Sequence, residues 1–535
     1  MNDNLFTVAP DVARISEGLR DTGYDFNTAI ADIIDNSIAA EANLVDVRIV
    51  VDFTGNIIIS VGDDGNGMDR PALMDAMKYG SPKRPSAKSL GKFGLGLKTA
   101  STAFCRRLSV VSKFTADVDP LRATWDLDVM AARNSWDLEI TSPSDSELEL
   151  LNITAKNNHG TVVIWESVDR ILNGYKDPTA PPLKKAVLRL VKNLQEHIAL
   201  VYQRFLDPND DRERTVNIRV NDEVVEAWDP FCIAETKEPV AFVTQDLVLP
   251  DGTKTNFIIK AFILPRKEEF SSEEAKVAAR VSNERQGVYV YRENRLIHGP
   301  DWMGMFKQEP HYSLMRVELS FDHTLDTAFQ VDIKKSRINL NSDLYEWLRD
   351  KILAAPRREA EIRYRRGVAS TATGTAALLH ASSSNVINQK SAGLTKAEVN
   401  IVDAGTGEVT VNNKSGTTTA TMKIVDSTDT GSIHITTAPT LEHGALWEPS
   451  IGRGSAAAVS LNTGHPFYSK AYLPNKENSP VIQALDYLLW ALAQAELNNV
   501  NNANKDAFEE FRIEVSRNLK KLVADLPDAV DGDIA

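Results

Sequence analysis

Residues Ala29–Ala40 read AIADIIDNSIAA and carry the pattern on which the interpretation of the chain depends. On a helix of 3.6 residues per turn, the isoleucines at positions 30, 34 and 38 stack along one side. The opposite side then holds two acids and an amide, Asp32, Asp35 and Asn36. This pattern alone is typical of an amphipathic surface helix. It indicates a functional helix only together with the motifs that follow it.

A second motif, DDGNGM at residues 63–68, comes directly after a predicted strand. A carboxylate at the end of a strand can accept a hydrogen bond from an exocyclic amine, and glycines let the backbone approach a flat ring. The sequence therefore predicts a ring-binding loop made by Asp63, Gly65, Gly67 and Met68. An ordinary turn rich in aspartate and glycine is the alternative that these residues leave open.

A third motif, GKFGLGLK at residues 91–98, places three glycines ahead of a predicted helix. The free N–H groups at the start of that helix and the ammonium of Lys98 would face an anion. The motif is not a Walker A loop, because no GK[ST] follows at the required spacing. Glycine-rich turns are common, so this motif indicates phosphate binding only in company with the others.

A fourth block, His159-Gly160-Thr161, opens an apolar run at residues 162–165. The four blocks, in this order, resemble the GHKL ATPases, which include gyrase B subunits, ninety-kilodalton heat-shock chaperones, histidine kinases and MutL. Within that group the chain looks most like the Microrchidia (MORC) ATPases and their prokaryotic relatives. The resemblance covers roughly residues 10–345 and implies ATP and Mg²⁺ as the cofactors.

The resemblance also implies a role for each matching position. Asp32 stands where the family has its general base, Asn36 where it has the amide that binds Mg²⁺, and Asp35 where it has the acid before that amide. Asp63 would bind the adenine amine, and Thr161 would support the adenine. The residues of the ATP lid would be Gly91, Lys92, Phe93, Gly94, Leu95, Gly96, Leu97 and Lys98.

One departure from the family concerns the base, which is usually glutamate and here is Asp32. Because the side chain is one methylene shorter, the attacking water is held less well, and we expect slow ATP hydrolysis. A nucleotide-binding switch without turnover is the alternative. The family's second domain also supplies a lysine to the terminal phosphate. Lys335 is the candidate and Lys334 the alternative, unless both are a solvated surface pair.

The resemblance, the proline pair at residues 181–182 and the composition after residue 345 together divide the chain into four predicted parts of an α+β protein. Residues 1–180 would form the GHKL α/β sandwich, with helices on one face of its sheet, and residues 181–345 a transducer-type domain of the ribosomal protein S-five-like kind. Residues 346–395 would be a basic helix and an Ala/Ser/Thr-rich linker. Residues 396–535 would be a small β module with C-terminal helices, in which Trp490 and its leucine neighbours need a partner surface, either inside the subunit or between subunits.

Composition also limits the function classes. No apolar run approaches the roughly twenty residues that span a bilayer, and the start lacks a signal-peptide pattern, so we expect a cytoplasmic chain without a membrane partner. Cys105 and Cys232 are too few for a disulfide framework or a cysteine metal site. The net charge of −14 opposes non-specific nucleic-acid binding by the whole molecule, although local basic patches can still bind it.

Three functions follow from the resemblance. The first is a clamp that forms a homodimer on ATP binding and closes on DNA, as expected of a MORC-like ATPase in genome defence. The second is a heat-shock-type chaperone for protein clients, and the third is a non-catalytic scaffold that senses nucleotide. The C-terminal region is a further candidate for contact with a protein partner.

Overall fold

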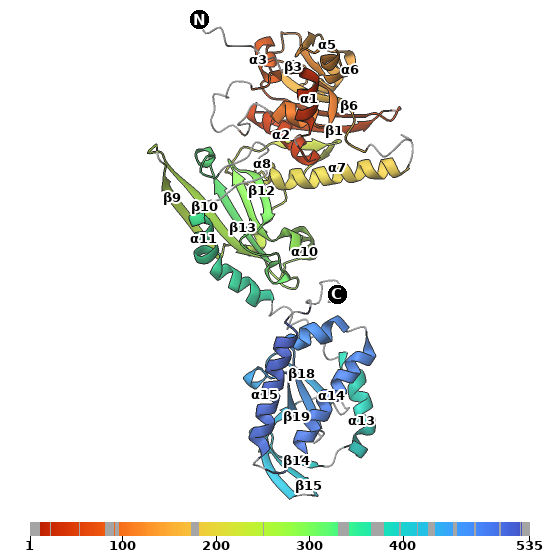
Figure 1. Cartoon of the computed structure of the whole chain (residues 1–535), viewed down its shortest axis with the longest axis vertical. Coiled ribbons are helices and arrows are strands. Elements are labelled where there is room, and N and C mark those ends of the chain that lie inside the picture. The colour runs from red at the N-terminus through yellow and green to blue at the C-terminus, as the bar shows by residue number, and fades with distance from the viewer. Residues whose placement is uncertain are drawn as a thin grey trace. The chain divides into compact units, whose positions relative to one another are not determined.

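The structure is a computed structural model that describes residues 11–21, 23–52, 54–80, 90, 96–172, 181–249, 251–329, 342–364, 379–394, 397–414, 416–425, 434–452, 457–475, 478–501, 504–524 and 526. The chain divides into two compact units (Figure 1). Unit 1 comprises Met1–Glu309 and Ser313–Arg357, and unit 2 comprises Pro310–Tyr312 and Arg358–Ala535.

Unit 1 contains an eight-stranded mixed sheet with the order β5-β4-β3-β6-β2-β1-β7-β8. Neighbouring strands are antiparallel except β1 and β7, which pair in parallel. The strands are β1 (Leu44–Val51), β2 (Ile57–Asp63), β3 (Cys105–Lys113), β4 (Leu121–Asp126), β5 (Glu139–Thr141), β6 (Gly160–Val168), β7 (Asn217–Val220) and β8 (Glu223–Val224).

The predicted domain boundary at residue 181 does not divide this sheet. Leu44 of β1 pairs with Asn217 of β7, and Val47 pairs with Val220. The chain therefore returns to the first sheet after the long helix α7 (Pro181–Val201) and the short α8 (Gln203–Leu206). The boundary prediction is corrected because a proline pair can begin a helix without ending a domain.

Helices cover both faces of the eight-stranded sheet, which corrects the prediction of helices on one face. Along β6, Val163 and Trp165 belong to the large core beneath α2, whereas Val162 and Ile164 belong to a smaller core with Leu151 of α6. A strand that is apolar on both faces needs a cover on each. The large core takes α1 (Val12–Arg20), α2 (Phe26–Ala39), α3 (Arg70–Met77), α4 (Gly96–Thr102) and α5 (Leu127–Arg133), and the smaller one takes α6 (Asp145–Ala155).

A five-stranded sheet with the order β12-β11-β13-β10-β9 follows in unit 1 (Figure 1). The hairpin between β11 and β12 turns at Glu293 and Asn294, whose φ angles of 45° and 61° suit a tight two-residue turn. The elements are β9 (Ala241–Val248), β10 (Lys254–Ile263), β11 (Gly287–Arg292), β12 (Arg295–Asp301) and β13 (Met315–Phe321), with the helices α9 (Ile233–Thr236), α10 (Glu273–Ala279) and α11 (Ser342–Trp347).

Unit 2 contains two small sheets, with the orders β14-β15-β16 and β17-β19-β20-β18. Its strands are β14 (Glu398–Asp403), β15 (Glu408–Asn413), β16 (Gly416–Thr421), β17 (Lys423–Val425), β18 (Ile435–Ala438), β19 (Trp447–Gly452) and β20 (Ala457–Asn462), and its helices include α13 (Ala381–Leu394), α14 (Ser479–Leu497) and α15 (Lys505–Leu522).

One sequence prediction about unit 2 is corrected, and one open alternative is decided. The stretch expected to be a linker includes α13, which is fixed by the buried His380 through contacts of 2.9 Å with Asp486 and 2.8 Å with Tyr468. Trp490 is buried in the core of unit 2, and its indole N–H donates to the carbonyl of Ala457. The partner surface of Trp490 therefore lies inside the chain.

In the parts of the chain that the structure describes, no helix has both the length and the apolar character that crossing a bilayer would require.

Candidate functional site

Helix α2 is buried on nearly every side, so the surface-helix interpretation of its sequence is wrong. Asp25 caps its start by accepting a hydrogen bond from the backbone N–H of Thr28 at 3.1 Å. Ten of its fourteen residues are buried, and these include Asp32 and Asp35. A polar side chain on such a helix loses its hydration unless it finds an internal partner.

Asp32 lies next to the start of α4. Its Oδ2 accepts a hydrogen bond from the hydroxyl of Tyr24 at 3.0 Å. A Cβ atom on Gly96 would lie 3.3 Å from the same oxygen. The predicted base and the last glycine of the predicted lid are therefore neighbours. No motif in the sequence pointed to Tyr24, whose hydroxyl holds the carboxylate in place.

Asp63 ends β2 and is bound to α2. The hydroxyl of Ser37 donates to Oδ2 of Asp63 at 2.8 Å, and the N–H of Gly65 donates to Oδ1 at 2.9 Å. Thr161, at the start of β6, is the cross-strand partner of Asp63. Sequence reasoning missed Ser37, and its one signal was a small polar residue next to Asn36 in an apolar helix.

The environment of Asp63 changes its acidity. Burial raises the pKa of this carboxyl to about 6, and the hydrogen bonds from Ser37 and Gly65 oppose that rise. Near pH 7.5 the side chain is therefore a buried anion that can accept a further hydrogen bond. An exocyclic amine is a suitable donor for it.

At positions 65 and 67 a side chain would clash with neighbouring backbone atoms, so both positions need glycine. A Cβ atom on Gly65 would lie 2.8 Å from the carbonyl oxygen of Ala40, and one on Gly67 would lie 1.9 Å from that of Lys113. Gly67 also has a φ of 64°, which disfavours other residues. The structure thus provides a different reason for these glycines than access for a ring: they let the loop pack against the ends of α2 and β3.

Met68 and Thr161 meet through a residue that the sequence interpretation left out. The N–H of Met68 donates to the hydroxyl of Ser112 at 2.8 Å, and that hydroxyl lies 2.8 Å from the hydroxyl of Thr161. Direct support of an adenine by Thr161 stays a prediction.

Asp35 contacts the second half of unit 1. Its Oδ1 accepts a hydrogen bond from Nε of Arg295 at 2.9 Å, and the hydroxyl of Tyr202 lies 2.8 Å from the same oxygen. No spacing in the sequence connects these three residues. The nucleotide-binding role expected of Asp35 stays a prediction, as does the Mg²⁺-binding role of the half-buried Asn36.

The predicted phosphate-binding residues are only partly described. Lys98 is buried, and its ammonium donates to the carbonyl of Ala76 at 2.9 Å. Leu97 packs against the large core. Contact of Lys98 with an anion stays a prediction. The predicted residues Gly91, Lys92, Phe93, Gly94, Leu95, Lys334 and Lys335 lie outside the described residues.

The donor set suits Mg²⁺ held mainly by a nucleotide. Among the described residues, no group of three or more His, Cys, Asp or Glu side chains is placed to hold a metal ion. Mg²⁺ bound with phosphates and waters needs only one or two side-chain oxygens from the protein. Asn36 on α2 has a side-chain oxygen of this kind.

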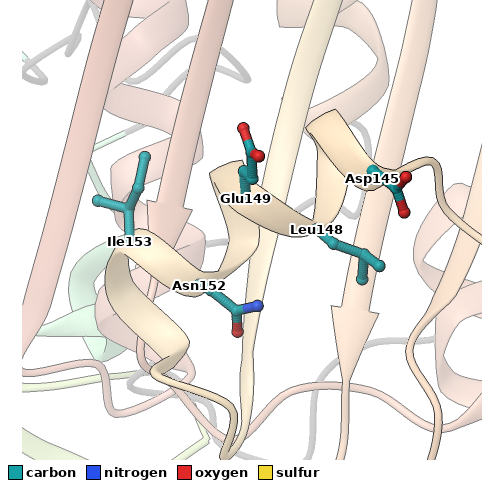
Figure 2. Close-up of a pocket in the computed structure, with 5 residues that line it drawn as sticks. All are labelled: Asp145, Leu148, Glu149, Asn152 and Ile153. Carbon is teal, nitrogen blue, oxygen red and sulfur yellow. The ribbon is translucent and has the colours of Figure 1, made fainter.

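A surface depression of about 480 Å³ lies elsewhere, on α6 (Figure 2). Its lining side chains are those of Asp145, Leu148, Glu149, Asn152 and Ile153. All five belong to the one helix, which covers the sheet face opposite α2. The depression is therefore separate from the residues around Asp32 and Asp63.

Residues 24–161 match the family model described as "Histidine kinase-, DNA gyrase B-, and HSP90-like ATPase". They form a GHKL-type ATPase domain. The match extends from Tyr24 to Thr161 and so includes α2, Asp63 and α4. Among solved structures, the N-terminal domain of a DNA repair protein is similar over 66% of this chain and 99% of its own, with 15% identity and a TM-score of 0.37. No curated protein matches the chain.

Asp63→Asn tests the assignment of the ring-binding carboxylate. The amide nearly preserves the shape and can keep partners in Ser37 and Gly65, but it can present a donor to the donor of an adenine amine. We expect ATP-analogue affinity, measured by calorimetry, to fall roughly tenfold to a hundredfold. Unchanged affinity would remove Asp63 from the site.

The same variant should also change how the free energy of unfolding depends on pH. The raised pKa of Asp63 means that its contribution to stability is present below pH 3.8 and is lost as the pH rises through about 6. Charging the buried group costs about 3 kcal/mol at neutral pH. In urea unfolding we therefore expect Asp63→Asn to be more stable than the parent at pH 7.5, with the gain much smaller at pH 4.5. An equal difference at both pH values would contradict this.

Proposed function

We propose that the protein binds ATP with Mg²⁺, hydrolyses it slowly, forms a homodimer on ATP binding and acts as an ATP-gated clamp on DNA in the manner of a MORC-like ATPase. The observation that carries the proposal is the arrangement along α2. Asp32 on this helix lies beside Gly96, and Ser37, further along the same helix, binds Asp63. Asp32 and Ser37 are five positions apart, which corresponds to about 7 Å along the helix axis.

Each residue has one role in the proposed reaction. The carboxylate of Asp63 accepts a hydrogen bond from the adenine amine, and Met68 and Thr161 pack beside it. The carboxylate of Asp32 takes a proton from the attacking water, and the hydroxyl of Tyr24 orients that carboxylate. Asn36 would hold Mg²⁺ together with the phosphates, and the ion would supply neutralisation of the triphosphate charge. The reaction needs no covalent nucleophile.

The shortness of Asp32 favours slow turnover and also supports the second candidate, a nucleotide-sensing scaffold. The hydrogen bond from Tyr24 already occupies one oxygen of the carboxylate. The attacking water must then be held by a carboxylate that has a second task and a shorter side chain than the glutamate usual in the family. Lys335 would meet the terminal phosphate on closure in both candidates.

Substitutions of Asp32 separate the two candidates. We expect Asp32→Ala to bind ATP but to lose turnover, because general-base help supplies about 10²–10⁴-fold. Asp32→Glu should keep or raise turnover, since Gly96 has no side chain to obstruct a longer carboxylate. Steady-state ATPase rates of the three proteins decide the matter. If Asp32→Ala matches the parent, another group is the base. Activity gained only in Asp32→Glu would identify the parent as a binding switch.

The proposed dimerisation on ATP binding can be tested by measuring the sedimenting mass with and without nucleotide. At micromolar protein, we expect a non-hydrolysable ATP analogue with Mg²⁺ to double the sedimenting mass of the full chain. Asp63→Asn serves as the control, because it should fail to respond at the same nucleotide concentration. Equal mass with and without analogue in the parent, under conditions where calorimetry shows binding, would defeat the clamp.

The solvent face of α7 supports a polyanionic client. Between Lys184 and Lys192 its exposed side chains are those of Lys184, Lys185, Leu188, Arg189 and Lys192, and we call the four cations the α7 stripe. None of them forms an ion pair with an acid that the structure describes. Lys184 and Lys185 lie close to the start of α7, where a cation opposes the helix dipole, so these two do not serve the stability of the helix. In a chain of net charge −14, such a local concentration of positive charge suits the phosphates of DNA.

Neutralising the α7 stripe tests the DNA part of the proposal. We expect a variant with glutamine at all four positions to bind duplex DNA more weakly and with a flatter salt dependence. The slope of log K against log salt should fall by about 0.9 for each phosphate that the variant no longer neutralises. A control variant with glutamine at four other exposed lysines carries the same change in net charge: Lys254, Lys307, Lys520 and Lys521. Equal effects in both variants would assign the binding to overall charge instead of α7.

A further inference from the structure

The contact between Asp35 and Arg295 is a buried ion pair that joins the two sheets of unit 1. Asp35 is 0% exposed and Arg295 is 3% exposed. Asp35 belongs to α2 under the eight-stranded sheet, whereas Arg295 begins β12 of the five-stranded sheet. The two residues are 260 positions apart in the chain.

Tyr202 completes this contact. Its hydroxyl lies 2.6 Å from the carbonyl oxygen of Ala31 and 2.8 Å from Oδ1 of Asp35. The guanidinium of Arg295 lies 5.9 Å from the centre of the Tyr202 ring. The α2 backbone, the Asp35 side chain and the start of β12 are thus held by one connected set of polar contacts.

The turn next to Arg295 is itself fixed. Asn294 accepts a hydrogen bond from Arg204 at 2.9 Å and donates one to Glu213 at 2.9 Å. Glu293 lies 2.6 Å from the ring nitrogen Nδ1 of His323. Arg295 therefore extends from a rigid hairpin, so its position reports the position of the five-stranded sheet.

Stability alone is a poor reason for such a pair. Taking two charges out of water offsets most of their attraction, and a buried ion pair is often worth no more than well-packed apolar side chains. What the pair does supply is a fixed geometry, because neither charge can leave the other without becoming a buried, unpaired ion. The pair therefore fixes the rotation of α2 relative to the hairpin.

The rotation of α2 determines where the proposed catalytic groups point. Asp35 lies directly before Asn36 and three residues after Asp32, so a turn of the helix at Asp35 would move both side chains. Arg295 is also within electrostatic range of Asp32. A small misplacement of a reacting group can cost about 10²-fold in rate.

We propose that Arg295 is a positioning residue for ATP hydrolysis, which acts through Asp35 to hold Asp32 and Asn36 in their working orientation. This inference rests on the proposed ATPase function and assigns Asp35 to the link between the sheets instead of to the nucleotide. The five-stranded sheet then takes part in the reaction without touching the substrate.

The chain offers a matched control in Arg292 and Asp326. This second arginine and aspartate are also buried, with Nε and Oδ1 2.6 Å apart, and Arg292 belongs to the same hairpin. Their ion pair joins β11 to the short turn that follows β13, both on the side of the five-stranded sheet. Arg292→Gln therefore removes a buried guanidinium from the same sheet without cutting the link to Asp35.

The experiment compares Arg295→Gln, Arg292→Gln, Asp35→Asn and the double variant of Asp35 and Arg295 in the full chain. We expect Arg295→Gln to lower turnover tenfold to a hundredfold with ATP-analogue affinity within about threefold of the parent. Arg292→Gln should keep turnover within about twofold per folded molecule. The double variant should be no slower than Arg295→Gln, because both changes cut one link.

Hydrogen exchange in α2 provides a readout that does not depend on hydrolysis. We expect faster exchange in residues 26–39 for Arg295→Gln and not for Arg292→Gln. If the parent hydrolyses no ATP but this difference is present, the ATPase proposal fails and the positioning link stands. Equal turnover loss and equal exchange in the two arginine variants would overturn the inference. So would a loss of ATP affinity in Asp35→Asn as large as that in Asp63→Asn, because Asp35 would then be a nucleotide ligand.

Discussion

The burial of α2 is the constraint on which the arrangement of unit 1 depends. A polar side chain left unpaired on a helix that is buried on nearly every side would lose its hydration without replacement. Asp32, Asp35 and Ser37 therefore take three different partners: the hydroxyl of Tyr24, the guanidinium of Arg295 and the carboxylate of Asp63. Those three contacts connect the N-terminal segment, the second sheet and the end of β2 to one helix. The candidate site is thus built from the hydrogen-bond partners of polar side chains on a single buried helix.

Sequence reasoning was most successful where a motif and its local structure coincide. The position of α2, the placement of Asp63 at a strand end and the start of a helix at Gly96 followed from periodicity, from glycine and from the order of the four blocks. The family match over residues 24–161 supports the same part of the chain. These features are local, because the residues that determine them lie within a few turns or strands of one another.

The features that the sequence did not reveal depend on long-range contacts. The contacts of Arg295 and Tyr202 with Asp35 join residues that are far apart in the chain, and no periodicity relates their positions. Helical periodicity grouped Asp35 with Asp32 and Asn36, but it could not tell which neighbour each side chain would meet. Gly65 and Gly67 illustrate a second limit, because the sequence showed that small residues were needed there but not that the crowding came from Ala40 and Lys113. The sequence also did not reveal that α6 covers the second face of the sheet, because an apolar run such as that of β6 does not indicate whether one face or both are buried.

The return of β7 to the first sheet has a consequence for how the chain folds. β1 is bounded on one side by β2 and on the other by β7, which is 166 residues beyond the end of β1 along the chain. Until that later strand is made, one edge of β1 presents unpaired N–H and C=O groups that invite pairing with another chain. Non-local pairings of this kind form slowly, because a long loop must close before the contact is gained. A fragment ending at residue 180 would keep that open edge permanently, so it would be prone to aggregation even though it includes the whole segment from Tyr24 to Thr161.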